Sequence, residues 1–326
     1  MFDSGLMTAD IVRMAPLMAA PAFFALFGLA ALGAPLLALV CRLGAEILRT
    51  QYLEVYARRL LRMGVSASVL SGLVALGSFG LVFLRTDWAW DWARSEPAAP
   101  GLWLACAVGY MLALLLARVT APPRYQRSDS PLLKTFVLAV LAVLLTWLSL
   151  SVAGDFALQA KAVLSAPVEG DMAVVPLQSA RLSAPSLHMA ASVGATLLLA
   201  LTCASAMSCG YLVLRRDHDP FGRDAYAQAL RLGARSALRC GILVAAAYPM
   251  TWMNLTDLLE GRPEAQAIKA LLAFSLASLL AACGLWAVLS RSQRPGGGLA
   301  LNGGLLLLWL SLTLLFSAAL LYFYAT

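Results

Sequence analysis

Histidine is scarce in this chain, which has only His188 and His218 in 326 residues. His188 lies about one turn inside an apolar stretch, in the run Pro185-Ser186-Leu187-His188-Met189-Ala190-Ala191-Ser192. A neutral imidazole is a good axial ligand for haem iron, and the small residues that follow on this helix face let a flat ring or a second helix approach closely. His188 is therefore a candidate cofactor and metal ligand. The alternative is a histidine that hydrogen-bonds a neighbouring helix or interfacial water, and His218, flanked by charges, is expected to be a solvated loop residue.

Methionine is the natural partner for such a histidine, because a thioether and an imidazole form a known pair of axial haem ligands. Three methionines are expected at similar depth: Met18, Met250 and Met253. Each has the alternative interpretation of a core filler. The six cysteines form no CxxC and no CxxCH, which excludes covalently attached c-type haem. No residue is predicted to be catalytic.

The composition indicates whether these residues belong to a soluble, a disordered or a membrane protein. Hydrophobic residues make up 61% of the chain, charged residues 13%, and the mean hydropathy is +0.80. Soluble domains carry about 25% charged residues, and disordered chains need low hydrophobicity and high net charge. Sustained two-residue alternation, the signature of a membrane β-barrel, is missing. An all-α polytopic membrane protein is therefore predicted.

Eight stretches are long enough to cross the hydrocarbon core, which needs about 20 apolar residues. They are 15–40, 64–84, 101–118, 134–153, 185–213, 237–255, 265–290 and 299–325. Most of the 24 Lys and Arg fall in the connections on the side away from the termini. The positive-inside rule then predicts external (periplasmic) termini in a bacterial inner membrane. The net charge of +7 follows from this topology, so no nucleic-acid partner is expected.

A short motif suggests an internal duplication. The pattern R-x-x-L-R-x-G occurs at Arg58–Gly64 and at Arg235–Gly241, each time where a basic segment runs into a span. Two four-helix units, 1–153 and 185–326, are predicted around an external loop at 154–184. The alternative is that any helix emerging from the cytoplasm begins with arginines.

The middles of the predicted spans contain no Asp, Glu, Lys or Arg. Proton pumps and ion-coupled transporters use such residues, which are costly in a bilayer unless they function. This pattern disfavours a proton relay within the chain.

Several runs resemble subunit I of the cytochrome bd quinol oxidases, in the layout of roughly the first 245 residues. The matching runs are Ser186 to Ser192 at the start of a span, Gly210 to Arg216 at its exit, the cytoplasmic segment Ala225 to Ser236, and Gln51 to Arg59. The resemblance implies that His188 is the axial histidine of a low-spin b haem.

Other family features are missing from the matching positions. The first span has no histidine, the third has no acidic residue, 254–264 is only a short connector, and 268–290 has no methionine. A short, degenerate relative that does not reduce oxygen is therefore expected.

The predicted function is an integral membrane subunit of a respiratory, quinone-linked electron-transfer complex, at most an electron-transfer subunit of an oxidoreductase. It would anchor a partner and carry one b haem or none. Expected partners are membrane or periplasmic subunits (a cytochrome or an iron–sulfur protein), a quinone or quinol, and lipid. Two alternatives remain: a transporter or permease for an uncharged or zwitterionic solute, and a membrane assembly factor without a ligand.

Overall fold

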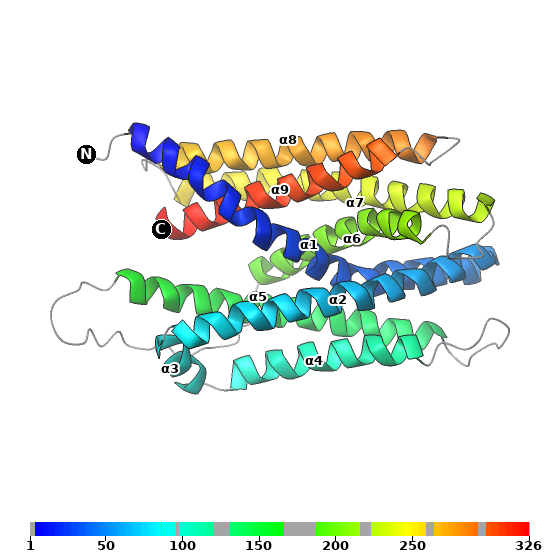
Figure 1. The fold of residues 1–326 in the computed structure, drawn as a ribbon, viewed down its shortest axis with the longest axis horizontal. Coiled ribbons are helices and arrows are strands. Elements are labelled where there is room, and N and C mark those ends of the chain that lie inside the picture. Colours follow the sequence, from blue (N-terminus) through cyan, green and yellow to red (C-terminus); the bar gives the residue numbers. More distant parts are fainter. Residues whose placement is uncertain are drawn as a thin grey trace.

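The computed structural model describes residues 4–85, 87–95, 98–119, 131–165, 187–215, 223–258, 264–292 and 298–325. Within these ranges the chain forms α-helices and no strands (Figure 1). The helices are α1 (Ser4–Leu48), α2 (Gln51–Arg85), α3 (Asp87–Ser95), α4 (Ala98–Val119), α5 (Pro131–Ser165), α6 (Leu187–Leu214), α7 (Arg223–Leu258), α8 (Glu264–Arg291) and α9 (Gly298–Ala325).

Seven of these helices are long and apolar enough to cross a membrane: α1, α2, α4, α5, α6, α8 and α9. The chain is thus a polytopic, all-helical membrane protein, as predicted. The predicted span 237–255 lies in α7, which is not among the seven in the described part of the chain. Arg231, Arg235 and Arg239 lower the hydropathy of its first half, and Pro249 lies inside the helix. The eighth span remains a prediction.

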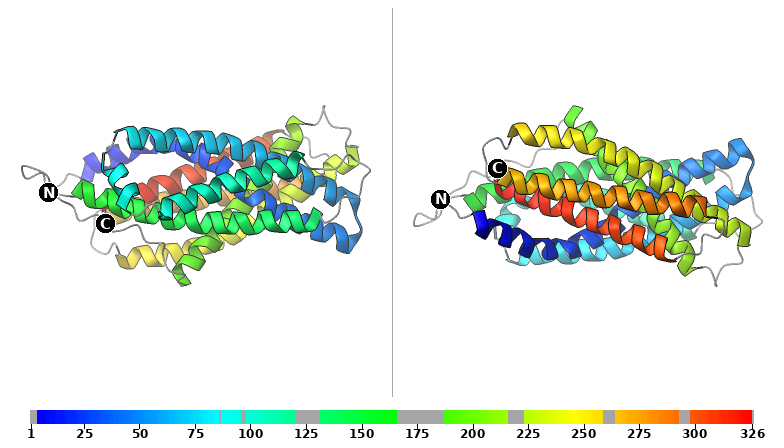
Figure 2. Two further views of the ribbon diagram at one scale, coloured as in Figure 1. Left: turned by 90° about the horizontal axis from the view of Figure 1, so that it is seen from below. Right: turned by 90° about the horizontal axis from the view of Figure 1, so that it is seen from above.

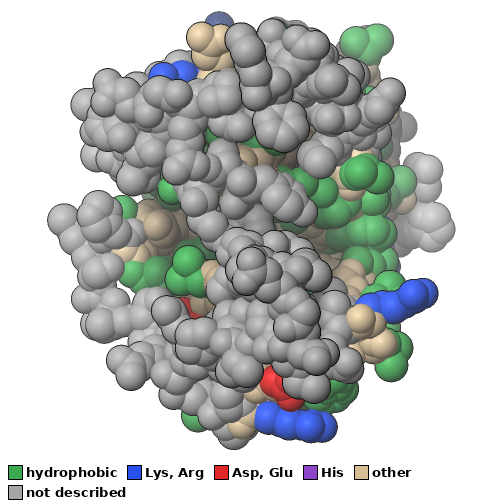
Figure 3. All heavy atoms as spheres, turned by 90° about the vertical axis from the view of Figure 1, so that its left-hand side faces the viewer, with side chains coloured by type: hydrophobic (Ala, Val, Ile, Leu, Met, Phe, Trp, Pro, Cys, Tyr) green, Lys and Arg blue, Asp and Glu red, His purple; other side chains and the backbone are tan. Residues whose placement is uncertain are grey.

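The long helices run lengthwise and alternate in direction, so that the start of α1 and the end of α9 lie at the same end of the molecule (Figure 1). We call this the terminal end. Figure 3 looks onto it, and the described side chains in view are mainly hydrophobic, with few charged ones. The opposite end holds the end of α1, the starts of α2 and α7 and the end of α8. Those segments carry most of the arginines in the described residues, so we call it the arginine end.

α1 occupies the centre of the molecule, where it packs against α2, α5, α6 and α9. The neighbour relations of the first four long helices recur in the last four. α1 contacts α2 and α5, and α4 contacts the same two helices; likewise α6 contacts α7 and α9, and α8 contacts the same two. A duplicated four-helix plan requires this pattern, while the unit boundaries at 153 and 185 remain predictions.

Small side chains allow α1 and α6 to approach closely. Ala30 and Ala34 of α1 and Ala200 of α6 are fully buried. A Cβ atom added to Gly33 would lie 2.1 Å from the carbonyl oxygen of Ala200, so the backbones themselves are in contact. Close backbone approach through glycine and alanine is the usual packing mode of membrane helices, because a bilayer supplies no hydrophobic drive for their association.

Two segments at the terminal end differ from the prediction. The tryptophan-rich run at 88–92, which lies between the predicted spans 64–84 and 101–118, forms the short helix α3. Phe156 to Leu164, part of the external loop predicted at 154–184, continues α5, which ends at Ser165; residues 155–166 contain no Gly or Pro. The Trp92 and Phe156 rings meet edge to face at 5.2 Å between centroids and join α3 to α5. The rest of the predicted loop, 166–184, lies outside the described residues.

Candidate functional site

His188 is the second residue of α6 and immediately precedes the candidate span Met189–Leu214. It lies in the first turn of the helix, whereas the sequence analysis placed it about one turn inside. The side chains at 187 and 188 lie outside the described residues, so His188 is placed here by its backbone alone. That position is at the terminal end of the candidate span, at the edge of its apolar part.

The three candidate methionines lie on the two helices that flank α6. Met250 and Met253 belong to the last part of α7, where their side chains are outside the described residues, and Met18 is half-buried on α1. α6 packs against both α1 and α7. Figure 2 shows the first turns of α6 beside α7 at one edge of the molecule, with the N-terminal part of α1 across from them. This arrangement favours the two α7 methionines over Met18 as neighbours of the His188 segment.

The turns of α6 that follow His188 present small, exposed residues. Ala190, Ala191, Ser192 and Ala195 are exposed, and a Cβ atom added to Gly194 would meet nothing within 4 Å. A flat ring or a partner helix would fit against this surface without displacing any described atom. We call residues 190–195 the small-residue face of α6.

The interior between the helices is held by neutral hydrogen bonds. Tyr56 on α2 shares one of 2.7 Å with Ser208 on α6, and Tyr248 on α7 shares one of 2.7 Å with Ser275 on α8. Tyr110 on α4 donates to the Ala31 carbonyl of α1 at 2.6 Å. Among the described residues, no group of three or more His, Cys, Asp and Glu side chains is placed to hold a metal ion. These hydroxyl groups join helices and provide no ionisable relay.

Two arginines that were assigned to loops are instead buried inside helices. Arg42 and Arg59 are each 9% exposed, and they belong to α1 and α2. Arg42 donates from Nη1 to the Thr135 hydroxyl of α5, which is fully buried. The loop assignment was wrong because α1 continues to Leu48, beyond the predicted end at 40, and α2 already begins at Gln51, before the predicted start at 64. Both residues lie toward the arginine end, so the middles of the spans remain free of buried charge in the described part of the chain.

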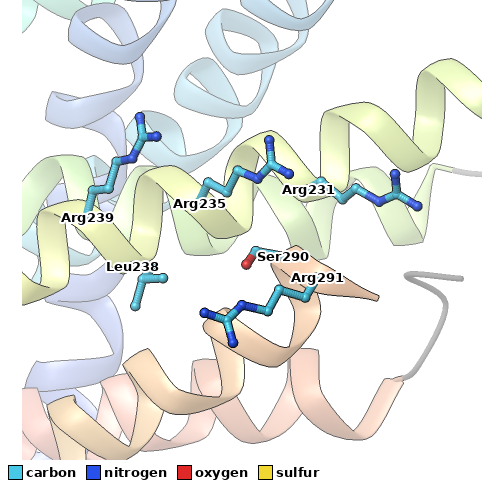
Figure 4. Close-up of a pocket in the computed structure, with 6 residues that line it drawn as sticks. All are labelled: Arg231, Arg235, Leu238, Arg239, Ser290 and Arg291. Atoms are coloured by element: carbon cyan, nitrogen blue, oxygen red, sulfur yellow. The ribbon is translucent and has the colours of Figure 1, made fainter. Parts of the chain in front are cut away.

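A pocket of about 460 Å³ opens between α7 and α8 at the arginine end (Figure 4). We call it the arginine pocket. Its lining residues are Arg231, Arg235, Leu238 and Arg239 from α7, with Ser290 and Arg291 from α8. Arg231 donates from Nε to the Ser292 carbonyl oxygen at 3.0 Å and so ties the two helices together. The Ser290 hydroxyl donates to the Ala287 carbonyl oxygen of its own helix at 2.8 Å.

The α7 arginines were predicted only as topological anchors. Their spacing of four residues, at 231, 235 and 239, also indicates a shared surface, because residues four apart lie on one face of a helix. No pattern in the sequence indicates that Ser290 and Arg291 line the same pocket. Only the packing of α8 against α7 brings them to that face.

No protein-family model matches the chain, and no curated protein matches it. Among solved structures, a chain of the bd oxidase from Geobacillus thermodenitrificans is similar, with a TM-score of 0.62 at 12% identity. The match covers 95% of this chain and 87% of that chain, so it extends well beyond the first 245 residues that carry the resemblance in sequence. At this identity the likeness concerns the fold alone. The chain has a bd-oxidase-like fold.

Proposed function

We propose that this chain is an integral subunit of a respiratory, quinone-linked electron-transfer complex of a bacterial inner membrane, and that it holds one b haem through His188. The observation that carries the proposal is the bd-oxidase-like fold over 95% of the chain, with His188 at the start of a span. The fold supports the class of complex, and His188 provides an imidazole at the edge of a candidate span.

The residues around His188 suit a b haem. The imidazole would provide one axial ligand, and Met250 or Met253 on α7, or else Met18 on α1, would provide the other. The small-residue face of α6 leaves room for a flat ring. A haem bound in this way supplies reversible one-electron transfer at its iron.

The same face supports the anchoring role. Ala190, Ala191 and Ala195 are exposed in this single chain, and small residues at helix surfaces let a second helix pack closely. We propose that another membrane or periplasmic subunit, a cytochrome or an iron–sulfur protein, covers the face and exchanges electrons there. A quinol of the membrane is the proposed electron donor. Oxygen reduction is not part of the proposal, since the ligands and acidic residues of that chemistry are missing from the matching positions.

A difference spectrum tests this function. The full chain is expressed with its genomic neighbours, purified in detergent and reduced either with dithionite or with a short-chain quinol. We expect a b-type α band with dithionite, and reduction of the same band by quinol when the partner subunits are present. A folded, haem-free chain would remove the electron-carrying role and leave only anchoring. A haem that quinol does not reduce in the complete complex would contradict the quinone link.

A further inference from the structure

We propose that the arginine pocket binds the phosphate headgroup of an anionic phospholipid, whose acyl chains lie along the exposed apolar residues of α7 and α8. The inference is independent of the proposed electron-transfer role. It depends on the positive charge of the pocket, on its volume, and on the exposed apolar side chains next to it on α7 and α8.

The pocket concentrates positive charge. Arg231, Arg235 and Arg239 are neighbours on one face of α7, and like charges four residues apart on a helix repel one another. Arg291 adds a fourth guanidinium from α8, and the six lining residues include no carboxylate. In the described part of the chain, no Asp or Glu lies within ion-pair distance of Arg235, Arg239 or Arg291. A bound anion would relieve this repulsion.

The kind of anion follows from the donors. A guanidinium is a planar fork of N–H groups that matches the oxygen atoms of a phosphate. Figure 4 shows the three α7 arginines in a row, with Arg291 on the α8 side of the pocket. The volume of about 460 Å³ lies within the range of roughly 300–1,000 Å³ that is typical of small-molecule sites. The bond from Arg231 to the Ser292 carbonyl holds the two walls together.

The surroundings point to a lipid as the source of the phosphate. Ile242 and Leu243 lie one turn beyond Arg239 on the same face of α7, and they are 51% and 54% exposed. Val288 lies one turn before Arg291 on α8 and is 62% exposed. Apolar side chains thus continue both walls of the pocket toward the middle of the spans. A molecule with an anionic head and apolar chains complements both parts, whereas free phosphate would use only the arginines.

The location suits such a ligand. The pocket lies at the arginine end, which the positive-inside rule assigns to the cytoplasm. The cytoplasmic leaflet is rich in anionic lipids, and basic pockets between membrane helices on that side bind phosphate headgroups.

Native mass spectrometry of the detergent-solubilised full chain tests the proposal. The chain is titrated with phosphatidylglycerol and, separately, with phosphatidylcholine of the same acyl chains. We expect phosphatidylglycerol to bind at least about tenfold more tightly, because each arginine near a membrane surface is worth about fivefold for an anionic headgroup. Equal binding of the two lipids by the wild-type chain would overturn the proposal without any variant.

A pair of matched double variants localises the site. Arg235→Gln/Arg239→Gln is expected to weaken phosphatidylglycerol binding by about 25-fold. Arg49→Gln/Arg62→Gln removes two exposed arginines from the same end but outside the pocket, and should change binding by less than about twofold. Unchanged binding by the pocket variant would overturn the proposal. Displacement of the lipid by equimolar inorganic phosphate would do the same, since it would identify a site for free phosphate.

Discussion

His188 is the second residue of α6, while Met250 and Met253 lie near the end of α7. Because the two helices are neighbours that run in opposite directions, these positions lie at the same end of the molecule. Met18 lies near that end as well, but on a helix segment across the molecule from the start of α6 (Figure 2). The proposed haem site therefore lies between the start of α6 and the last part of α7.

The ligand set leads to a prediction about the spin state of the iron. Loss of a sixth ligand leaves a haem iron five-coordinate and high-spin, and Met→Leu nearly conserves side-chain volume. We expect Met250→Leu/Met253→Leu to convert a low-spin spectrum to a high-spin one, measured by electron paramagnetic resonance of the oxidised protein. Met18→Leu is the matched control and should retain the low-spin signal. Conversion by Met18→Leu alone would place the second ligand on α1 instead.

The candidate residues of this site could be chosen from the sequence, but their contacts could not. His188 could be selected because it is one of two histidines, and the other lies among charges. The burial of Arg42 against Thr135 could not be predicted, since it depends on α5 packing beside α1 across 93 residues of sequence. The arginine pocket was predictable only on its α7 side, where the spacing of four residues is local.

Several helices in this protein approach closely at glycine residues or share hydroxyl hydrogen bonds. Gly33 touches the backbone of α6, and a Cβ atom added to Gly64 would lie 2.9 Å from the Cβ of Ala34 on α1. A Cβ atom added to Gly241 would lie 2.7 Å from the sulfur of Cys283 on α8. Gly64 and Gly241 are the last residues of the two R-x-x-L-R-x-G motifs. The motif glycine thus lies at a close helix contact in both α2 and α7, and the internal duplication remains a prediction.

Adding one methyl group at Gly33 tests the close approach of α1 and α6. Gly33→Ala would push the new Cβ into the Ala200 carbonyl, and overpacking of this kind costs about 1–3 kcal/mol. We expect a lower apparent Tm in detergent. Gly77→Ala, inside α2, is the control, because its added Cβ meets nothing within 4 Å and alanine is a better helix former by about 0.5–1 kcal/mol. Equal Tm values for the two variants would contradict the close approach of α1 and α6.

Most of the long helices were predictable from the sequence. A segment that crosses a lipid bilayer must satisfy its own backbone hydrogen bonds, and a helix does so. The ends of the elements were not predictable from apolar runs. α1 continues to Leu48 and α5 to Ser165, beyond the stretches predicted to end at 40 and 153, because polar residues at a membrane surface do not stop a helix. The helix α3 was missed because its run of alternating tryptophans has the composition of an interfacial loop.

In the whole molecule, the start of α1 and the end of α9 lie at the terminal end, and most of the described arginines lie at the arginine end (Figure 1). An even number of spans produces this arrangement, so α7 must also cross if the seven candidate helices do. The fold is similar to that of a bd oxidase chain at only 12% identity, so two chains with few identical residues have a similar arrangement of helices.

The orientation can be measured with reporters at the two chain ends. Green fluorescent protein fluoresces in the cytoplasm, and alkaline phosphatase is active in the periplasm. We expect fusions at both ends to show no fluorescence with the first reporter and to be active with the second, because the positive-inside rule assigns the arginine end to the cytoplasm. A fluorescent fusion at both ends would invert the orientation. Ends on opposite sides would show that one of the eight long helices does not cross.

The haem content of the purified chain is the most direct test of the central proposal that His188 holds a b haem. It is measured as pyridine haemochrome per mole of folded protein, with folding checked by gel filtration. We predict one b haem per chain in the wild type and in His218→Ala, the control that removes the other histidine, and none in folded His188→Ala. Full haem content in His188→Ala, or none in the folded wild-type chain, would contradict the proposal.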